Sequence, residues 1–375
     1  MKNTFLNLAV SGVQGLKPYL PGKPVEELER ELGINNILKL ASNENPLGPS
    51  KRVLKALKAE QLEVEIYPDG NGFMLKQALA EKFDLQQEQI TLGNGSNDIL
   101  DMIARVFLCQ GREAIFSQYA FAVYPIATQA VGAIAKIAAA FPPDHESMPY
   151  GHDLKAMLAL INEKTRVIFI ANPNNPTGTW LAKKTLKAFM DQVPKGVVVV
   201  VDEAYFEYVN EAEYPDTLQW LDQYPNLIVT RTFSKIYGLA SLRVGYAVCS
   251  EEIADLLNRV RQPFNVNTFS LVAATTALKD EQHIKRCADI NREGLAFWRE
   301  ACQARHLSFI PTVGNFITID VKQDAMPVYE GLLREGIIVR PVANYGLPHH
   351  LRITMGTKEQ NRRCLAALDK VLSLS

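Results

Sequence analysis

The chain has 375 residues, of which 47% are hydrophobic and 22% charged, and this ordinary globular composition excludes a fibrous or wholly disordered protein. Its 40 Lys and Arg residues nearly balance 41 Asp and Glu residues, and the resulting net charge of −1 argues against a nucleic-acid partner or a polybasic membrane attachment. The length predicts two or three domains or one large α/β unit.

Nothing in the sequence indicates export, a membrane span or a metal site. Residues 1–20 lack the continuous apolar segment of a signal peptide, and the longest aliphatic run, 197–201, is far too short to cross a bilayer. The five cysteines show no C-x-x-C spacing and the six histidines no H-E-x-x-H spacing. We therefore expect a cytoplasmic protein with reduced thiols and no metal.

Short apolar runs alternate with amphipathic stretches along the chain, a pattern typical of α/β proteins. Apolar residues in 99–107 recur at helical spacing, and the runs 167–171 and 197–201 predict strands that are buried on both faces. Further strands are expected at 227–230 and 244–248. These elements predict a mostly parallel sheet that is flanked by helices.

The later part of the chain predicts a second, smaller α/β unit. A helix is expected at 251–261, before this unit. The expected elements of the unit itself are strands at 316–321 and 337–339 and helices near 293–305 and 360–371. We expect residues 45–269 to form the large domain that binds a cofactor. Residues 1–44 would supply an N-terminal arm and part of the small domain, and residues 270–375 the rest of it.

Polar side chains follow three of the predicted strands, where sheets of this type place their ligands. Asp202 and Tyr205 follow one strand, Asn175 follows the neighbouring one, and Lys235 follows a third. Each has an ordinary explanation when taken alone, because an Asp after a strand is often a helix cap and a loop lysine is usually solvated. A carboxylate, a phenol, an amide and an amine at successive strand ends call for a common explanation.

Pyridoxal phosphate is a cofactor that needs these groups. It requires a lysine amine for a Schiff base and an acidic partner for its pyridine nitrogen. Lys235 can supply the first and Asp202 the second, while Tyr205 and Asn175 can hydrogen-bond the 3-oxygen of the ring. The sequence therefore predicts a pyridoxal-phosphate site.

The phosphate of this cofactor needs N–H groups and a cation. Residues 93–97, Gly-Asn-Gly-Ser-Asn, form a turn before a predicted helix, with Ser96 as the expected N-cap. The turn is neither a G-x-G-x-x-G motif nor a P-loop, which disfavours NAD and ATP. Arg243 is the expected cation, and Thr232 and Ser234 offer hydroxyls to the same phosphate.

With these motifs in view, the sequence resembles the fold-type I pyridoxal-phosphate aminotransferases of the class I/II superfamily, and among them the histidinol-phosphate aminotransferases. The resemblance covers nearly the whole chain. It is carried by residues 41–48 (Ala-Ser-Asn-Glu-Asn-Pro-Leu-Gly), 67–70 (Tyr-Pro-Asp-Gly), 93–98, 171–178 (with Asn-Pro-Thr-Gly), 202–205 (Asp-Glu-Ala-Tyr), 234–235 (Ser-Lys), Arg243 and 351–354 (Leu-Arg-Ile-Thr).

The resemblance implies a role for each matching residue that touches the cofactor. Lys235 would carry the Schiff base and move the proton, Asp202 would pair with the pyridinium, and Tyr205 and Asn175 would hold the 3-oxygen. Phe121 would stack on the ring, with Tyr119 as the alternative. The phosphate would be bound by Gly95, Ser96, Asn97, Thr232, Ser234 and Arg243, and by Tyr67 of the other subunit.

Substrate contacts and assembly follow from the same resemblance. Arg352 would receive the substrate carboxylate, Tyr19 and Arg340 the phosphate of histidinol phosphate, and Asn45 would complete the substrate site. The family implies a homodimer with shared active sites. Its reaction moves an amino group between L-histidinol phosphate and 2-oxoglutarate, giving imidazole acetol phosphate and glutamate, by a ping-pong mechanism in histidine biosynthesis.

Three other functions remain open on the residues alone. The same scaffold could transfer amino groups from aromatic amino acids, since imidazole and phenyl side chains occupy similar space. A pyridoxal-phosphate decarboxylase of a phosphorylated amino acid would need a similar anion pocket. A non-catalytic regulator is disfavoured because the sequence shows no basic stripe for DNA.

Overall fold

The computed structural model describes residues 4–19, 21–59 and 65–373. The predicted domains therefore include residues that lie outside the described part of the chain. These are residues 1–3 and 20 of the predicted arm, 60–64 of the predicted large domain and 374–375 of the predicted small domain.

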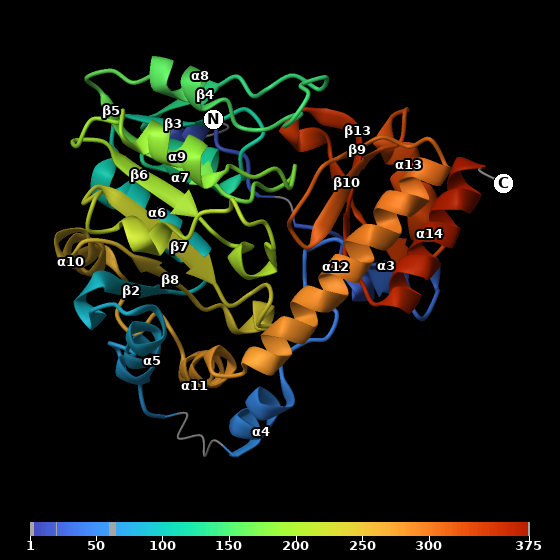
Figure 1. The fold of residues 1–375 in the computed structure, drawn as a ribbon, viewed down its shortest axis with the longest axis horizontal. Helices are drawn as coiled ribbons and strands as arrows, with labels where there is room; N and C mark the ends of the chain where they lie inside the picture. Colours follow the sequence, from blue (N-terminus) through green and yellow to red (C-terminus); the bar gives the residue numbers. More distant parts are fainter. Residues whose placement is uncertain (1–3, 20, 60–64, 374–375) are drawn as a thin grey trace.

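A seven-stranded sheet forms the centre of the larger part of the molecule (Figure 1). In spatial order its strands are β2 (Ile90–Gly93), β8 (Gly245–Val248), β7 (Leu227–Thr232), β6 (Val198–Asp202), β5 (Thr165–Ala171), β3 (Glu113–Ser117) and β4 (Ile134–Ala138). Neighbouring strands from β7 to β4 are parallel, whereas β8 runs antiparallel to both β2 and β7. The predicted α/β fold with a mostly parallel sheet is confirmed.

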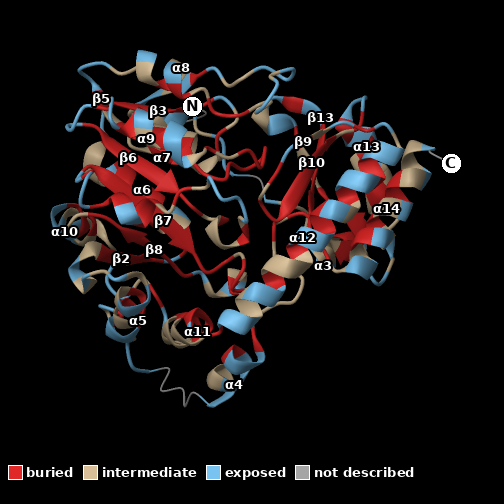
Figure 2. Ribbon diagram, in the orientation of Figure 1, coloured by how far each residue is buried: buried red, intermediate tan, exposed pale blue. Residues whose placement is uncertain are grey.

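The strands of the sheet other than β4 are buried on both faces, whereas the edge strand β4 is largely exposed. Successive side chains of a strand point to opposite faces, so Val199 and Val201 of β6 join one core while Val198 and Val200 join the other. The central strands are accordingly buried and the outer sides of the helices exposed (Figure 2). One face is covered by α5 (Phe73–Phe83), α8 (Leu154–Ala159), α9 (Lys183–Met190) and α11 (Thr268–Leu278), and the other by α6 (Ser96–Phe107), α7 (Val123–Ala130) and α10 (Glu251–Val260).

A four-stranded antiparallel sheet forms the smaller part of the molecule. Its spatial order is β12 (Arg340–Val342), β13 (Leu347–Thr354), β10 (Phe316–Asp320) and β9 (Phe309–Ile310), and its helices are α12 (Glu281–Ala304), α13 (Ala325–Arg334) and α14 (Lys358–Leu372). The helix expected near 293–305 is the second half of α12. The whole helix begins after Asp280, whose carboxylate accepts a hydrogen bond from the N–H of His283 and so caps the helix. The first half of α12 was missed because it is mostly polar.

The N-terminal segment contacts both parts of the molecule. Strand β1 (Leu38–Lys39) pairs in parallel with β11 (Ile337–Ile338), and α3 (Val25–Leu32) packs its buried Leu28 against Ile338. Helix α2 (Ser11–Gln14) lies instead against α7 of the larger part. Residues 25–39 thus pack with the C-terminal part and α2 with the larger part, and the predicted domain boundaries at 44/45 and 269/270 stay predictions.

The remaining described elements are short or peripheral. They are α1 (Thr4–Leu8), α4 (Lys51–Ala59) and the 3-10 helices η1 (Gln87–Gln89), η2 (Phe206–Tyr208), η3 (Thr217–Trp220), η4 (Ala240–Leu242) and η5 (Ala343–Tyr345). Among the helices of residues 4–19, 21–59 and 65–373, none combines the length and apolar character that crossing a bilayer requires.

Candidate active site

A cavity of about 350 Å³ opens at the carboxyl ends of β5, β6 and β7 and extends to the small sheet. Most of the residues singled out in the sequence line it. They are Tyr19, Ser96, Asn97, Phe121, Asn175, Asp202, Tyr205, Thr232, Ser234, Lys235, Arg243, Arg340 and Arg352. The topology thus gathers side chains that lie more than 300 residues apart in the chain.

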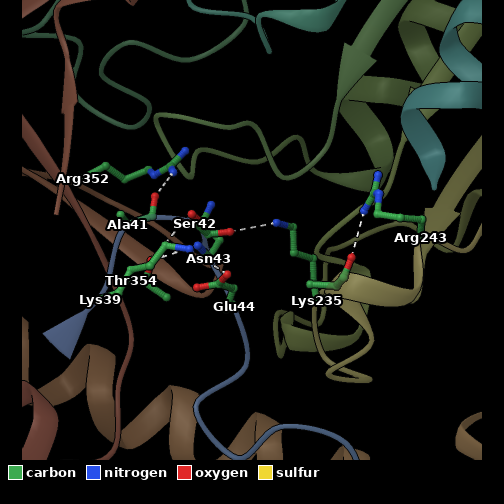
Figure 3. Close-up of polar contacts among 10 residues, drawn as sticks. Lys39, Ala41, Ser42, Asn43, Glu44, Lys235, Arg243, Arg352 and Thr354 are labelled. Atoms are coloured by element: carbon green, nitrogen blue, oxygen red, sulfur yellow. Dashed lines mark hydrogen bonds and ion pairs between the residues drawn. The ribbon is translucent and has the colours of Figure 1, made fainter. Parts of the chain in front are cut away.

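Lys235 lies in the turn that follows β7. The turn is held locally, because the hydroxyl of Thr232 accepts a hydrogen bond from the N–H of Ser234 at 3.1 Å. The Lys235 side chain points across the cavity, where Nζ donates to the carbonyl oxygen of Ser42 at 3.1 Å (Figure 3). Burial, and then the nearby Arg352 guanidinium, lower the pKa of Lys235 from 10.5 to about 8. At neutral pH roughly a tenth of this amine is therefore neutral and nucleophilic.

Asp202 ends β6 and is only 5% exposed. One carboxylate oxygen accepts from the hydroxyl of Tyr124 at 2.9 Å, and the other accepts from the hydroxyl of Thr230 at 3.1 Å. Burial raises the pKa of this carboxyl, whereas the hydrogen bonds and the charge of Lys235 act in the opposite direction. The carboxylate is thus poised to gain from a cationic partner in the cavity.

The loop after β5, Asn172 to Gly178, uses its three asparagines differently. Asn172 bonds the main chain of Leu181, and Asn174 bonds the carbonyl of Tyr119 at 2.9 Å. Only Asn175 turns its amide toward the cavity, where its oxygen accepts a hydrogen bond from Arg352. The first two asparagines fix the loop so that the third is presented to the site.

Arg352, in β13 of the small sheet, joins the two parts of the molecule. Besides Asn175 it donates to the carbonyl of Ala41 at 2.7 Å (Figure 3), and its buried Nε has no hydrogen-bond partner among the described residues. Its neighbour across the strand pair is Arg340 of β12. Cross-strand neighbours lie on the same face, so two guanidinium groups border the same end of the cavity.

Tyr205 lies beside Asp202 and is 3% exposed. Its hydroxyl accepts a hydrogen bond from the amide of Asn43 at 2.8 Å. Burial raises the pKa of Tyr205 to about 12, although Arg352 acts to lower it. The phenol therefore remains protonated at neutral pH and can donate into the cavity.

The start of α6 and Arg243 form a cradle suited to an anion. Helix N-termini present unpaired N–H groups, and α6 begins at Ser96 next to Gly95, whose φ is +80°. A Cβ at Gly95 would lie 2.3 Å from Nη2 of Arg243, so only glycine allows this approach. The hydroxyl of Ser234 accepts from the Arg243 guanidinium at 3.2 Å (Figure 3).

The expectation that Ser96 caps α6 is wrong. Ser96 is the first residue of the helix, and the capping position is occupied by Gly95, which has no side chain to cap with. The carboxylate of Asp98 instead accepts from the N–H of Asn94 at 2.8 Å, which ties down the turn before the helix. The Ser96 side chain lines the cavity instead.

Three further residues are clarified by their positions. Phe121 lines the cavity, whereas Tyr119 packs edge-on against Tyr150 at 5.5 Å and belongs to a separate apolar cluster. Asn45 does not line the cavity; its amide holds the carbonyl of Ile236 at 2.6 Å. Asn45 therefore braces the chain next to Lys235 from outside the cavity.

Tyr67 does not line the cavity. It is 76% exposed and its ring stacks on Phe264 at 4.5 Å. Phe264 is itself 44% exposed, so the pair forms an apolar projection on the surface.

Sequence reasoning missed three groups that hold the site together. The carbonyl of Ser42 and the amide of Asn43 lie in the segment 41–48, which was recognised, but nothing local indicated what they contact. Tyr124 is buried as a core aromatic would be, but its hydroxyl donates to Asp202. The available signal was a tyrosine, rather than a phenylalanine, at a core position, because a buried tyrosine hydroxyl usually has a hydrogen-bond partner.

The cavity thus combines an amine of lowered pKa, a buried carboxylate, a protonated phenol and two arginine-bordered anion sites. Within residues 4–19, 21–59 and 65–373, no cluster of three or more His, Cys, Asp or Glu side chains could hold a metal ion. The chain belongs to the aminotransferase class I and II family, whose model matches residues 35–368.

Within that family the chain is similar over its whole length to histidinol-phosphate aminotransferases. Histidinol-phosphate aminotransferase 2 of Pseudomonas aeruginosa is 57% identical over 371 residues, which cover 98% of this chain and 99% of the relative. The protein of the same name from Methylococcus capsulatus is 56% identical over 368 residues, covering 97% and 98%. The crystal structure of histidinol-phosphate aminotransferase from Sinorhizobium meliloti in complex with pyridoxal-5'-phosphate is 27% identical, with a TM-score of 0.87 over 98% of each chain.

Proposed function

We propose that the chain transfers an amino group between L-histidinol phosphate and 2-oxoglutarate, as a cytoplasmic pyridoxal-phosphate enzyme of histidine biosynthesis. The observation that carries this proposal is the position of Lys235, whose amine of lowered pKa shares one cavity with Asp202 and with two anion sites. Relatives of 50 to 57% identity bear the name of this activity.

The residues of the cavity fit pyridoxal phosphate. When bound, this cofactor supplies an aldehyde that condenses with amines and a ring that accepts electrons from the carbon bearing the amine. The start of α6 and Arg243 would hold its phosphate, Asp202 its ring nitrogen, and Tyr205 and Asn175 its 3-oxygen. Phe121 would cover one face of the ring.

Lys235 would act as the proton carrier. With its pKa lowered to about 8, Nζ could accept the proton from the α-carbon of the amino donor and deliver it to the former aldehyde carbon of the cofactor, which would leave the amino group on the cofactor. Asp202 would stabilise the positive charge of the ring nitrogen while the proton moves. Tyr205, protonated at neutral pH, would keep donating a hydrogen bond throughout.

Arg340 and Arg352 would take the anionic ends of both substrates. Like charges directly opposite each other on neighbouring strands are destabilising, so an anion between these two arginines relieves their repulsion. A phosphate monoester in one half-reaction and a carboxylate in the other both satisfy guanidinium donors. Tyr19, whose ring lies 5.9 Å from the Arg340 guanidinium carbon, would border the phosphate.

We propose that two copies associate so that Tyr67 of one protomer reaches the cofactor phosphate of its partner. The support is that Tyr67 is exposed, lies outside its own cavity and is braced by Phe264. The nearby side chains of Ile66, Phe73 and Met74 are between 51% and 61% exposed, and such apolar exposure favours a protein contact.

The test is a panel of half-reactions. The holoenzyme is mixed separately with histidinol phosphate, phenylalanine, tyrosine and glutamate, and conversion of the cofactor from its aldehyde to its amine form is followed by absorbance. We expect histidinol phosphate and glutamate to react fastest. If histidinol phosphate is among the slowest donors, the substrate assignment is wrong.

One alternative has a specific observation in its favour. The cavity wall carries Phe121, Val123 and Ile126, which suit the ring of an aromatic amino acid as well as an imidazole. The variant Arg340→Ala separates the two, because it should lose turnover of the phosphorylated donor while phenylalanine turnover persists. Equal loss with both donors would count against a phosphate site at Arg340. A decarboxylase would release carbon dioxide and form no glutamate from 2-oxoglutarate.

A further inference from the structure

Tyr124 contacts two residues that line the cavity, Asp202 and Phe121, although it does not line the cavity itself. It lies on α7 and its side chain is fully buried. Its hydroxyl donates to Asp202 Oδ2 at 2.9 Å. Its ring stacks on Phe169 of β5 at 4.8 Å and 9°, and meets Phe121 edge to face at 5.9 Å and 86°.

These contacts leave Tyr124 little freedom. The stacked ring of Phe169 restricts the plane of the phenol, and in this plane the hydroxyl meets the carboxylate at the end of β6. Thr230, on β7, donates to the other oxygen of Asp202 at 3.1 Å. Both oxygens therefore have a hydroxyl donor from the protein, which favours the ionised form of the carboxylate.

The phenol of Tyr124 stays protonated, and so remains a hydrogen-bond donor, at neutral pH. Burial, and next the charge of Asp202, raise the pKa of Tyr124 well above 10. A donor that never ionises and a carboxylate that it stabilises form a charge-assisted hydrogen bond, the stronger class of such bonds.

We propose that Tyr124 is a positioning residue that keeps Asp202 ionised and aimed into the cavity, and thereby holds the proton on the ring nitrogen of bound pyridoxal phosphate. The ring of Tyr124 also packs against Phe121. One side chain would therefore align both Asp202, at the edge of the cofactor ring, and Phe121, on the face of that ring. The inference rests on the proposed function, because it requires that Asp202 meet that ring nitrogen.

The test compares cofactor affinities. Cofactor-free protein is titrated with pyridoxal phosphate and, separately, with its 1-deaza analogue, in which a C–H replaces the ring nitrogen. We expect Tyr124→Phe to bind pyridoxal phosphate about tenfold to a hundredfold more weakly than the unmodified protein, the effect of losing a hydrogen bond to a charged group. With the deaza analogue the two proteins should differ much less, because no ring charge remains for Asp202 to stabilise.

The control variant is Tyr119→Phe. It removes the same hydroxyl from a tyrosine that lies outside the cavity, where its oxygen accepts a hydrogen bond from the Gln118 amide at 3.3 Å. Its affinity for both compounds should match that of the unmodified protein. A second variant, Thr230→Val, removes the other hydroxyl donor of Asp202 and should weaken binding in the same nitrogen-dependent way, which keeps the test decisive if Tyr124→Phe folds poorly.

The outcomes are distinguishable. Equal affinities of Tyr124→Phe and the unmodified protein for pyridoxal phosphate would overturn the inference, and so would a loss of the same size with the deaza analogue, which would indicate a purely structural role. Failure of the unmodified protein to bind pyridoxal phosphate would overturn the proposed function, and the inference with it.

Discussion

The buried amine of Lys235 destabilises the cofactor-free protein, and its replacement by methionine should therefore raise stability. In the folded chain the pKa of this amine is lowered from 10.5 to about 8, chiefly by burial. Methionine has a similar length but no charge, so Lys235→Met removes the cost of holding an ammonium group in the cavity. It also removes the hydrogen bond to the carbonyl of Ser42.

The size of the effect follows from the shift in pKa. A lowering of roughly 2.5 units corresponds to about 3 kcal/mol of destabilisation when both the folded and the unfolded state are protonated. The lost hydrogen bond offsets about 1 kcal/mol of this, leaving a gain of about 2 kcal/mol for Lys235→Met near neutral pH. As the pH rises from 8 toward 10.5, the folded amine is neutral while the unfolded one still holds its proton, so the stability of the unmodified protein rises.

The assay is calorimetric unfolding of the cofactor-free proteins near pH 7 and again near pH 9.5. Over this range the unmodified protein should gain about 2 kcal/mol relative to Lys235→Met, so the gap in Tm should nearly close. Lys184→Met, which changes an exposed lysine of α9, should show no such dependence on pH. A gap that stays constant with pH, or a variant less stable than the unmodified protein near pH 7, would refute the reasoning.

Three further predictions concern activity. Borohydride reduction of the holoenzyme should fix a cofactor-derived mass at Lys235, and Lys235→Ala should show neither that mass nor amino transfer; persisting transfer would contradict this. Asn43→Ala removes the donor to the Tyr205 hydroxyl. In steady-state kinetics it should lower kcat/KM about tenfold, which is the cost of one unsatisfied buried hydrogen bond. An unchanged kcat/KM would refute the role of Asn43. Co-expressed Lys235→Ala and Tyr67→Ala chains should recover about a quarter of the unmodified activity, since half of the dimers are hybrids with one intact site; no recovery would argue against shared sites.

Much of the fold, and the residues at the strand ends in the site, could be predicted because short stretches of sequence indicate the strands and where they end. The consecutive valines of β6 can only form a strand with two buried faces, and Asp202 then falls at its carboxyl edge. The same reasoning applies to Asn175 and Lys235 at the ends of neighbouring parallel strands. The rule that such ends share one edge of the sheet brings the three together without knowledge of any contact.

The rest depends on contacts that sequence spacing does not reveal. Lys235 meets the carbonyl of Ser42, which lies 193 residues away, and Arg352 bonds Asn175 across 177 residues. The wrong expectation for Ser96 has a different cause, since residues that suit a helix cap compete locally and the geometry of the turn decides which of them is used.

The position of Arg352 in β13, near the C-terminal end of the chain, has a consequence for the order in which the cavity is completed. A growing chain that stops before β13 would already carry the lysine and its acidic neighbours, but not Arg352, and the wall of the cavity would be incomplete. The cavity that holds the amine of Lys235 is therefore completed only when the C-terminal part of the chain has been made, well after the reactive residue itself.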